Sequence, residues 1–393
     1  MKSSVFYRSF LSAAVVGTIS SFAFAEQDAQ FGSAEQVNNR INEDNKNTKR
    51  PFKDRMADKG LLLAADYSAL AMGLDEALGD ADDSASGGMF RFYGSWAAID
   101  NGALVWKAEH RHSYTDTEPR FLPFNAGVLG LEAPVFSDQG TRLTNLYWKQ
   151  RFNDGRSTVI AGMLDVTDYT DVYAVASPWT GFVNFAFSTG NITMALPNDA
   201  ALGVAGATML GDNFFIIGGV TDMESDPTKP LDGFDSFFND GHYFKSVDLG
   251  WTSSQDNIFV DNVHVTLWDA DKSETLGQAA DSGVNLSASK MLGQWLPFVR
   301  ASWADKGALL GFDKSVSTGF SYYGLGKEGN NLGLAINWAD AKADSKQVTT
   351  ELFYFMKLLP GWELTPDIQY VQNPVNSTED SAIIAGVRTR LIW

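Results

Sequence analysis

The sequence predicts a transmembrane β-barrel of about sixteen antiparallel strands, with short periplasmic turns and long extracellular loops. Segments of about ten residues alternate between apolar and polar side chains, and the connections between them alternate between tight and long. The last segment, 382–393, places Ile383 on one face, Arg388 and Arg390 on the other, and ends on Trp393. Because side chains alternate across a strand, this segment suits a wall between lipid and water, with an aromatic residue at the interface.

The N-terminus predicts a secretory signal followed by a polar segment. Lys2 and Arg8 form a positive n-region, an apolar run follows, and Ala23-Phe24-Ala25 matches a small-x-small cleavage site. Beyond this site no apolar run approaches the roughly 18 residues of a membrane helix, which excludes a helical membrane protein. We therefore divide the chain into a Sec-type signal peptide (1–25, with cleavage near Ala25), a polar periplasmic lead-in (26–53) and an outer-membrane barrel (54–393).

The chain is acidic and has no cysteine. Its formal net charge is -18, and removal of Lys2 and Arg8 with the signal peptide brings it to about -20. This charge argues against nucleic acid as a partner. The acids gather in predicted loops, where a solvated surface is a better interpretation than a cation site. Without disulfides the fold needs its own hydrogen-bond network, and a closed barrel has one because every strand is paired.

Sixteen alternating segments predict the strands, each near the length that crosses a bilayer when tilted. They lie near 60–72, 88–99, 103–114, 141–152, 156–165, 200–210, 213–221, 243–253, 258–269, 282–292, 295–304, 314–325, 331–339, 347–359, 362–371 and 381–393.

The connections alternate in length, as in bacterial outer-membrane barrels. Tight turns at 100–102 and 153–155 are separated by long segments such as 115–140. The longest, 166–199, combines aromatic residues with carboxylates, and so many aromatics suit a buried loop. It predicts a constriction loop folded into the lumen, because a barrel this wide otherwise leaves an aqueous channel. A hydrophobic plug or a pad packed on the wall remains the alternative interpretation.

The charged strand faces are expected to point into the lumen, because an Arg or Lys facing lipid near the midplane costs about 2–4 kcal/mol. For any one of these residues, an interstrand salt bridge that only holds the wall is an equally good interpretation. Opposed acids and bases across a narrow pore would create a transverse field. The candidate pore-lining residues are Arg91, Tyr93, Lys107, Glu109, Arg111, Lys149, Arg151, Asp168, Trp179, Arg300, Glu351, Asp367, Arg388 and Arg390.

Four motifs resemble the carbohydrate-selective porin (OprB) family. The resemblance covers roughly residues 51–393 but departs from the family at the terminal Trp393, where Phe is usual, and in lacking a W-G-G stretch before the barrel. These departures leave the subfamily and the substrate open. The motifs are L-T-P-D-I-Q-Y-V-Q-N-P at 364–374, G-V-R-T-R-L at 386–391, R-M-A-D-K-G at 55–60, and L-Y-W-K-Q-R-F at 146–152 followed by A-G-M-L-D at 161–165.

The resemblance implies a Gram-negative outer-membrane porin that passes mono- and oligosaccharides by facilitated diffusion. Polar groups would match sugar hydroxyls and aromatic faces would match pyranose C–H faces, with binding weak enough for release. The partners implied are carbohydrate substrates, outer-membrane lipid, lipopolysaccharide and the barrel-assembly machinery, for which Trp393 would serve as the terminal signal. The resemblance favours a monomer, with a trimer as the alternative.

Other functions stay open at this point. A general or cation-preferring porin fits the acidic composition, and a barrel enzyme or a structural or adhesive barrel represents a different class. No Gly-x-Ser-x-Gly elbow, phosphate loop or zinc spacing occurs, so we expect no enzyme activity and no cofactor. His110 and His112 share one strand face, but an isolated histidine pair is usually incidental, so we expect no metal site.

Overall fold

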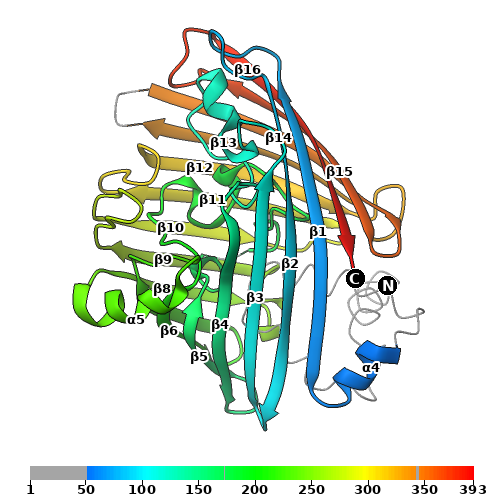
Figure 1. The fold of residues 1–393 in the computed structure, drawn as a ribbon, viewed down its shortest axis with the longest axis vertical. Coiled ribbons are helices and arrows are strands. Elements are labelled where there is room, and N and C mark those ends of the chain that lie inside the picture. The colour runs from blue at the N-terminus through cyan, green and yellow to red at the C-terminus, as the bar shows by residue number, and fades with distance from the viewer. Residues whose placement is uncertain (1–50, 172, 342–344) are drawn as a thin grey trace.

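A computed structural model describes residues 51–171, 173–341 and 345–393 of the protein, and this part forms a closed antiparallel barrel of sixteen strands (Figure 1). Each strand pairs with its neighbours in sequence, and β1 pairs with β16 to close the wall. The strands are β1 Leu61–Leu74, β2 Ser84–Ile99, β3 Gly102–Ser113, β4 Gly140–Phe152, β5 Ser157–Leu164, β6 Ala201–Leu210, β7 Phe214–Asp222, β8 Tyr243–Thr252, β9 Asn262–Ala270, β10 Asp281–Ser289, β11 Trp295–Ala304, β12 Phe312–Tyr323, β13 Asn331–Ala341, β14 Ser345–Leu359, β15 Trp362–Gln372 and β16 Ser381–Ile392.

The predicted barrel is therefore confirmed, strand by strand. The predicted signal peptide and almost all of the polar lead-in lie outside the described residues. Among the described residues, no helix is long and apolar enough to cross a membrane. The short helical segments are α4 Pro51–Ala57, η1 Pro119–Ala126, η2 Val166–Asp168, η3 Phe185–Phe187, η4 Thr189–Ile192, η5 Pro230–Asp232, α5 Gly233–Asp235, η6 Ser236–Asp240 and η7 Gln255–Asn257.

Two predicted strand boundaries are wrong by four residues: the strand expected from 88 begins at Ser84, and the ninth strand begins late. The strand expected from 258 begins only at Asn262, because the preceding turn folds inward. Ile258 and Phe259 in this turn are buried, and the Asn262 side chain donates a hydrogen bond to the Ile258 carbonyl over 2.7 Å. The Gln255 side chain reaches the carbonyl of Gly155 in the β4–β5 turn over 2.8 Å. Ile258 and Phe259 therefore look like the start of the strand in the sequence, because they are apolar, although they belong to the turn.

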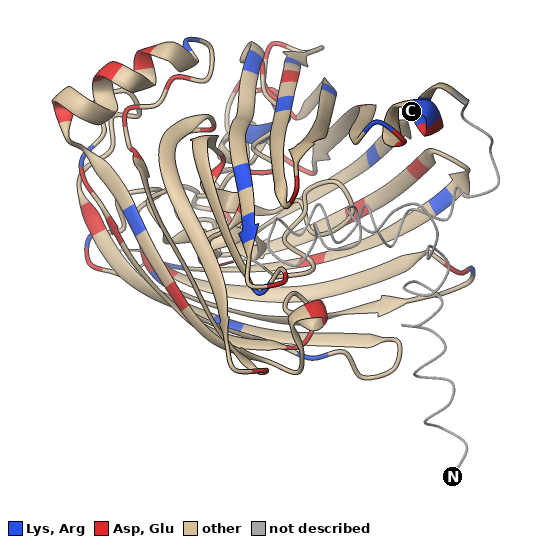
Figure 2. Cartoon of the chain, turned by 90° about the horizontal axis from the view of Figure 1, so that it is seen from below, with Lys and Arg blue, Asp and Glu red and all other residues tan. Residues whose placement is uncertain are grey.

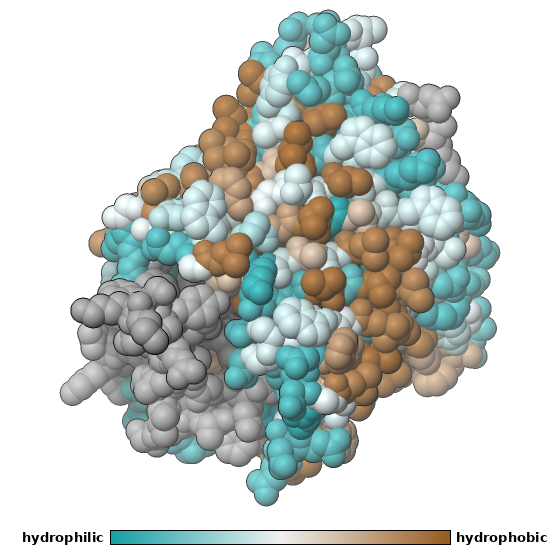
Figure 3. Space-filling view, turned by 180° about the vertical axis from the view of Figure 1, so that it is seen from behind, coloured by the Kyte–Doolittle hydropathy of each residue, from teal (hydrophilic) through white to brown (hydrophobic). Residues whose placement is uncertain are grey.

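The two faces of the wall separate as predicted. On β2, Phe90 and Phe92 are 45% and 39% exposed, whereas Arg91 between them is 1% exposed. On β16, Val387 faces outward and Arg388 inward. Figure 3 shows apolar side chains gathered over the outer wall. In Figure 2, Asp and Glu stand out in the connections and on the helical segment between β7 and β8, while bands of Lys and Arg mark several strands.

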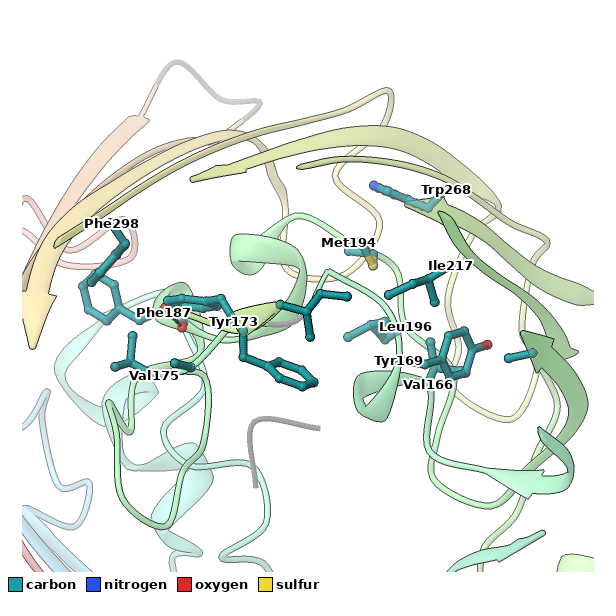
Figure 4. Packing of buried hydrophobic residues seen from close by; sticks show 14 of the residues in the cluster. Val166, Tyr169, Tyr173, Val175, Phe187, Met194, Leu196, Ile217, Trp268 and Phe298 are labelled. Atoms are coloured by element: carbon teal, nitrogen blue, oxygen red, sulfur yellow. Dashed lines mark hydrogen bonds between the residues drawn. The ribbon is translucent and has the colours of Figure 1, made fainter. Parts of the chain in front are cut away.

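The inner face is not uniformly polar. Phe215 of β7, Trp268 of β9, Phe298 of β11 and Phe353 of β14 are inward-facing and buried, and they belong to one hydrophobic cluster. About a third of this cluster comes from the β5–β6 connection, which lies inside the barrel (Figure 4). Aromatic side chains of the lumen wall therefore pack against the loop, interspersed with polar residues of the same strands.

Val387 and Leu391 of β16 both face outward. The free-energy cost of placing a charged side chain at each position should depend on its depth in the membrane. Val387→Arg places a cation near the middle of the hydrocarbon band and should reduce the free energy of unfolding by about 2–4 kcal/mol. Leu391→Arg, on the same face but next to the terminal aromatic residue, should cost about 0–1 kcal/mol. Denaturant unfolding in phospholipid vesicles measures both. Equal costs would contradict this placement of Val387 in the hydrocarbon.

Candidate functional site

The β5–β6 connection crosses the lumen, and its described residues, 165–171 and 173–200, are buried or partly buried. Its apolar side chains pack against the inner wall: Figure 4 shows Tyr173 and Phe187 near Phe298 of β11, and Tyr169 near Ile217 of β7. The ring centroids of Tyr173 and Phe298 are 5.4 Å apart. Apolar packing and polar contacts together hold this loop, and β11 supplies both, through Phe298 and Arg300.

Two inward-facing residues of the wall bind the backbone at the tip of the loop. Glu351 of β14 accepts hydrogen bonds from the backbone N–H groups of Val183 (2.7 Å) and Asn184 (3.0 Å). Arg388 of β16 donates to the carbonyl of Gly181 over 2.9 Å. The Arg388 donor is a guanidinium, and a hydrogen bond from a charged group is stronger than a neutral one, particularly where water is excluded. The tip is thereby fixed to the far wall.

A second connection joins the same network. Glu132 of the β3–β4 loop is fully buried and accepts a hydrogen bond from the Asn184 side chain over 2.6 Å. Gln369 of β15 donates to Glu132 over 2.7 Å and to Asp367 over 3.3 Å. Burial raises the pKa of Glu132 well above its ordinary value. The two long loops are therefore held to each other and to β15.

Asp171 is the polar centre near the base of the loop. Its carboxylate forms an ion pair with Arg300 and accepts hydrogen bonds from the Gly190 backbone (2.7 Å) and the Asn285 side chain (3.0 Å). The Nε2 atom of His264 lies 3.1 Å from its other oxygen. Burial acts to raise the pKa of Asp171, but Arg300 and His264 outweigh it, so this pKa lies below its ordinary value. Asp171 thus stays ionised inside the barrel.

On the β1–β2–β16 side, one carboxylate serves two arginines. Asp66 of β1 pairs with Arg91 (2.6 Å) and with Arg390 (2.7 Å), and the Tyr93 hydroxyl donates to it over 3.4 Å. The Arg91 guanidinium also lies 3.9 Å from the ring centroid of Trp179 on the loop tip. A cation–π contact of this kind joins the wall to the loop.

Carboxylates and bases face each other where the loop leaves β5. Lys107 of β3 lies 3.5 Å from Asp165, and the Asn145 side chain donates to Asp168 over 3.1 Å. Burial, reinforced by the neighbouring charge of Asp168, raises the pKa of Asp165 to about 7, although Lys107 opposes the shift. Asp165 therefore changes charge within the physiological range of pH.

The return of the loop to β6 repeats this arrangement. Asp199 lies 3.0 Å from Arg111 and 2.8 Å from Arg142, and Arg111 also pairs with Glu109 over 2.5 Å. Burial acts to raise the pKa of Asp199, but the two arginines lower it below its ordinary value. Bases on β3 and β4 therefore form ion pairs with acids at both ends of the loop.

The structure separates the predicted residues into two groups. Residues of the first group hold the loop in place by binding the loop backbone, by binding a wall side chain that contacts the loop, or by a ring contact. They are Arg300, Glu351, Asp367, Arg388 and Trp179. The other group lies on or against the wall of β2, β3, β4 and β16: Arg91, Tyr93, Lys107, Glu109, Arg111, Lys149, Arg151, Asp168 and Arg390.

Several residues of this network were not among the candidates. Arg142 is missed because the β3–β4 pairing changes register between Lys107 and Ala108. This bulge changes which alternate residues of β4 point into the lumen, so that Arg142 points inward. Asp66 is at a position of β1 whose side chain points into the lumen, but its neighbours in the sequence are small or apolar. Asp171 and Glu132 lie on irregular loops, where no period predicts orientation. An isolated acid within an apolar run is the signal that could have identified Asp66.

The histidine pair lies near the end of β3. The Nδ1 atom of His110 lies 2.8 Å from the Thr141 hydroxyl, and His112 contacts the Tyr67 hydroxyl over 3.0 Å and the ring of Tyr114. In the part of the chain that the structure describes, no group of three or more His, Cys, Asp or Glu residues could hold a metal ion. These histidines belong to an aromatic group on the outer wall.

Comparisons with known proteins agree with the barrel. The high-pH structure of Pseudomonas putida OprB superposes with a TM-score of 0.70 at 14% identity, covering 87% of this chain and 96% of that one. A Rhodopseudomonas blastica porin triple mutant superposes with a TM-score of 0.53 at 11% identity, covering 85% and 100%. At these identities the likeness establishes the fold. A search of curated proteins found no match.

The model of one protein family matches most of the barrel. It is the carbohydrate-selective porin, OprB family, and the match extends over residues 110–391. The match includes the C-terminal motifs, the loop that crosses the lumen and both of its charged ends. The family and the fold indicate a channel rather than an enzyme. The chain therefore belongs to the carbohydrate-selective porin (OprB) family and is a porin of the outer membrane.

Proposed function

We propose that mono- and oligosaccharides diffuse between the inner face of β2–β4 and the β5–β6 loop. The observation that carries this proposal is the concentration of charged side chains on the inner face of β3 and β4, where ion pairs of Lys107 with Asp165 and of Arg111 with Asp199 hold the two ends of the loop and would border the path. Such a passage offers donors and acceptors to hydroxyl groups along its length. Many weak contacts allow a solute to enter and to leave.

In this proposal the predicted residues have two roles. The path is lined by Arg91, Tyr93, Lys107, Glu109, Arg111, Lys149, Arg151, Asp168 and Arg390. The remaining residues position the loop, so they set the width of the path and do not contact the solute. They are Trp179, Arg300, Glu351, Asp367 and Arg388.

The same proposal includes the surroundings of the barrel. The chain would reach the outer membrane after signal cleavage near Ala25, fold through the barrel-assembly machinery, and contact lipid and lipopolysaccharide as a monomer. Trp393 supports this view: it is 54% exposed, its backbone N–H donates to Ala65 over 2.8 Å, and the Lys53 ammonium lies 4.2 Å from its ring centroid. An exposed terminal aromatic is available to an assembly factor.

Sugar transport predicts a current that sugars reduce. In planar bilayers, single channels of the mature protein should conduct KCl, and glucose or maltose at millimolar concentrations should lower the current by occupying the path. A pore that conducts ions without sugar block, and whose reversal potential in a KCl gradient indicates cation selectivity, would support the general-porin alternative. A barrel that does not conduct would contradict transport altogether.

The positioning role predicts a wider pore when an anchor is removed. Arg388→Ala deletes the donor to the loop tip and Glu351→Gln weakens its acceptor, so both should raise single-channel conductance and the sugar concentration for half-block. Arg156→Ala removes an arginine from an exposed periplasmic turn and should change neither. If the conductance of Arg388→Ala equals that of the wild type, Arg388 does not hold the loop.

The raised pKa of Asp165 predicts a pH-dependent ion preference. Since this pKa is about 7, the carboxyl is neutral below it and ionised above it. Lowering the pH from 8 to 6 should therefore reduce the K⁺/Cl⁻ permeability ratio, and Asp165→Asn should remove that change. Asp212→Asn, at a side chain 91% exposed, serves as the control. Reversal potentials in a KCl gradient measure the ratio; an unaltered pH response in Asp165→Asn would exclude this carboxyl as its origin.

A further inference from the structure

We propose that the outer wall of β5–β9 binds one molecule of lipid A, the acylated and phosphorylated anchor of lipopolysaccharide. Its acyl chains would lie in a hollow of the wall and one phosphate would lie at Lys245. The proposal rests on the contact with lipopolysaccharide proposed above and is independent of sugar transport. The hollow measures about 570 Å³, which is within the usual range of ligand sites, roughly 300–1,000 Å³.

Two glycines that face each other form the floor of the hollow. Gly206 of β6 pairs with Gly218 of β7, and both occupy outward positions of their strands. In the same row, Val159 of β5 pairs with Gly206, and Val247 of β8 pairs with Gly218. Both valines are exposed and form the sides of the hollow. The lipid-facing surface is therefore recessed between two apolar ridges.

The backbone does not require glycine at position 206. Gly206 has no positive φ, and the pairing of β6 with both neighbours is regular there. A Cβ atom at this position would come no closer than 3.4 Å to its neighbours, which is an ordinary van der Waals contact. Glycine weakens a strand, and without a bulge or bend it marks the close approach of another molecule. We therefore interpret Gly206 as room for an occupant.

The connection between β7 and β8 leans over the outer wall at the extracellular end of the hollow. Its helical segment, residues 230–240, includes α5, which lies beside the end of β6 (Figure 1). A Cβ atom at Gly233 would lie 3.6 Å from Leu202 of β6 and 4.0 Å from Asp222 of β7. Both of these residues occupy outward positions, yet both are buried, and Ser236 donates a hydrogen bond to Asp222. The segment thus rests on the membrane side of the barrel.

The free face of this helical segment is apolar. Leu231, Phe234 and Phe238 follow the spacing of one helical face and are 73%, 50% and 72% exposed. Exposed apolar side chains that gather in this way mark an interaction surface, and Leu and Phe on one face of a helix are typical of a membrane interface. These side chains therefore stand at the interface of the outer leaflet, above the hollow.

A charged group borders the hollow on its extracellular side. Lys245 of β8 faces outward one row above Val247, and its ammonium lies 2.8 Å from Asp269 and 3.6 Å from Asp271. A lipid has the same order of groups, with a charged head at the interface and chains below. The ammonium complements a phosphate, and long cationic side chains reach toward the interface.

The width of the hollow favours a lipid with several chains. Val159 and Val247 are three strand spacings apart, roughly 14 Å, which exceeds the width of a single acyl chain. A second copy of the barrel would bring a convex wall to this surface and leave the recess at Gly206 and Gly218 unfilled. An outer-leaflet lipid with several chains and a phosphate fills the recess and reaches Lys245.

The test titrates lipid A with two phosphates into the mature protein in detergent and measures the Kd by native mass spectrometry. Gly206→Leu fills the hollow and should raise the Kd about tenfold, because apolar contact with the chains is lost. Gly73→Leu is the matched control: it changes an outward glycine of β1 where a Cβ atom meets nothing closer than 3.8 Å, and the Kd should stay the same. Heat-modifiable migration in gels verifies that each variant has folded.

The contact with the phosphate is tested separately. Lys245→Gln should raise the Kd about fivefold, because one cationic partner is lost. Asp269→Asn should lower the Kd, because this acid competes with the phosphate for Lys245. Lys272→Gln should leave the Kd unchanged, although Lys272 is also exposed and lies 2.7 Å from an acid, Glu274.

Three results would overturn the proposal. If Gly206→Leu binds lipid A with the Kd of the wild type, the chains do not lie in the hollow. If phosphatidylethanolamine binds as tightly as lipid A and Lys245→Gln changes neither Kd, the wall does not select a lipid. If the wild type is oligomeric while Gly206→Leu is monomeric and still binds lipid A, the hollow is an interface between copies. Sugar block of the wild-type current tests transport independently, since its absence would contradict transport and leave the lipid site in place.

Discussion

The lumen depends on a small set of buried charges that hold the β5–β6 loop inside the barrel. Asp171 with Arg300 fixes its base, and Glu351 and Arg388 fix its tip through backbone groups. A loop without regular structure carries many backbone polar groups that would be costly to bury unpaired. Polar and charged side chains on the wall satisfy these groups, which allows an irregular chain to cross the interior of a barrel.

Apolar packing also holds the β5–β6 loop against the wall. The inner faces of β7, β9, β11 and β14 carry aromatic residues that pack in one cluster with apolar residues of the loop, beside polar wall residues such as Arg300 and Glu351. The passage proposed for solutes therefore lies on the other side, where β2–β4 present Arg91, Lys107 and Arg111. In the proposed function, the packed loop narrows the wide barrel to a path along β2–β4.

Periodicity predicted the barrel well because the membrane imposes it. A strand with lipid on one side and water or core on the other must alternate, so strand positions, faces and the even strand count follow from the sequence. The inward orientation of Arg91, Glu351 and Arg390 follows from the same rule. The rule fails where the backbone is irregular: at the bulge that turns Arg142 inward, and at Ile258 and Phe259, which extend the strand pattern but lie in a turn.

The sequence by itself determined the fold class, the lipid and lumen faces and the family motifs, because each is set by local alternation or by a contiguous run of residues. Only the tertiary structure decided which charges meet. Glu351 contacts a loop 167 residues earlier in the chain, and Asp66 pairs with Arg390 across 324 residues. Such contacts depend on how the closed wall brings distant strands around one loop. For that reason the sequence could propose Trp179 and Arg388 as lumen residues. Only the structure could show that Trp179 of the loop contacts the wall and that Arg388 of the wall contacts the loop.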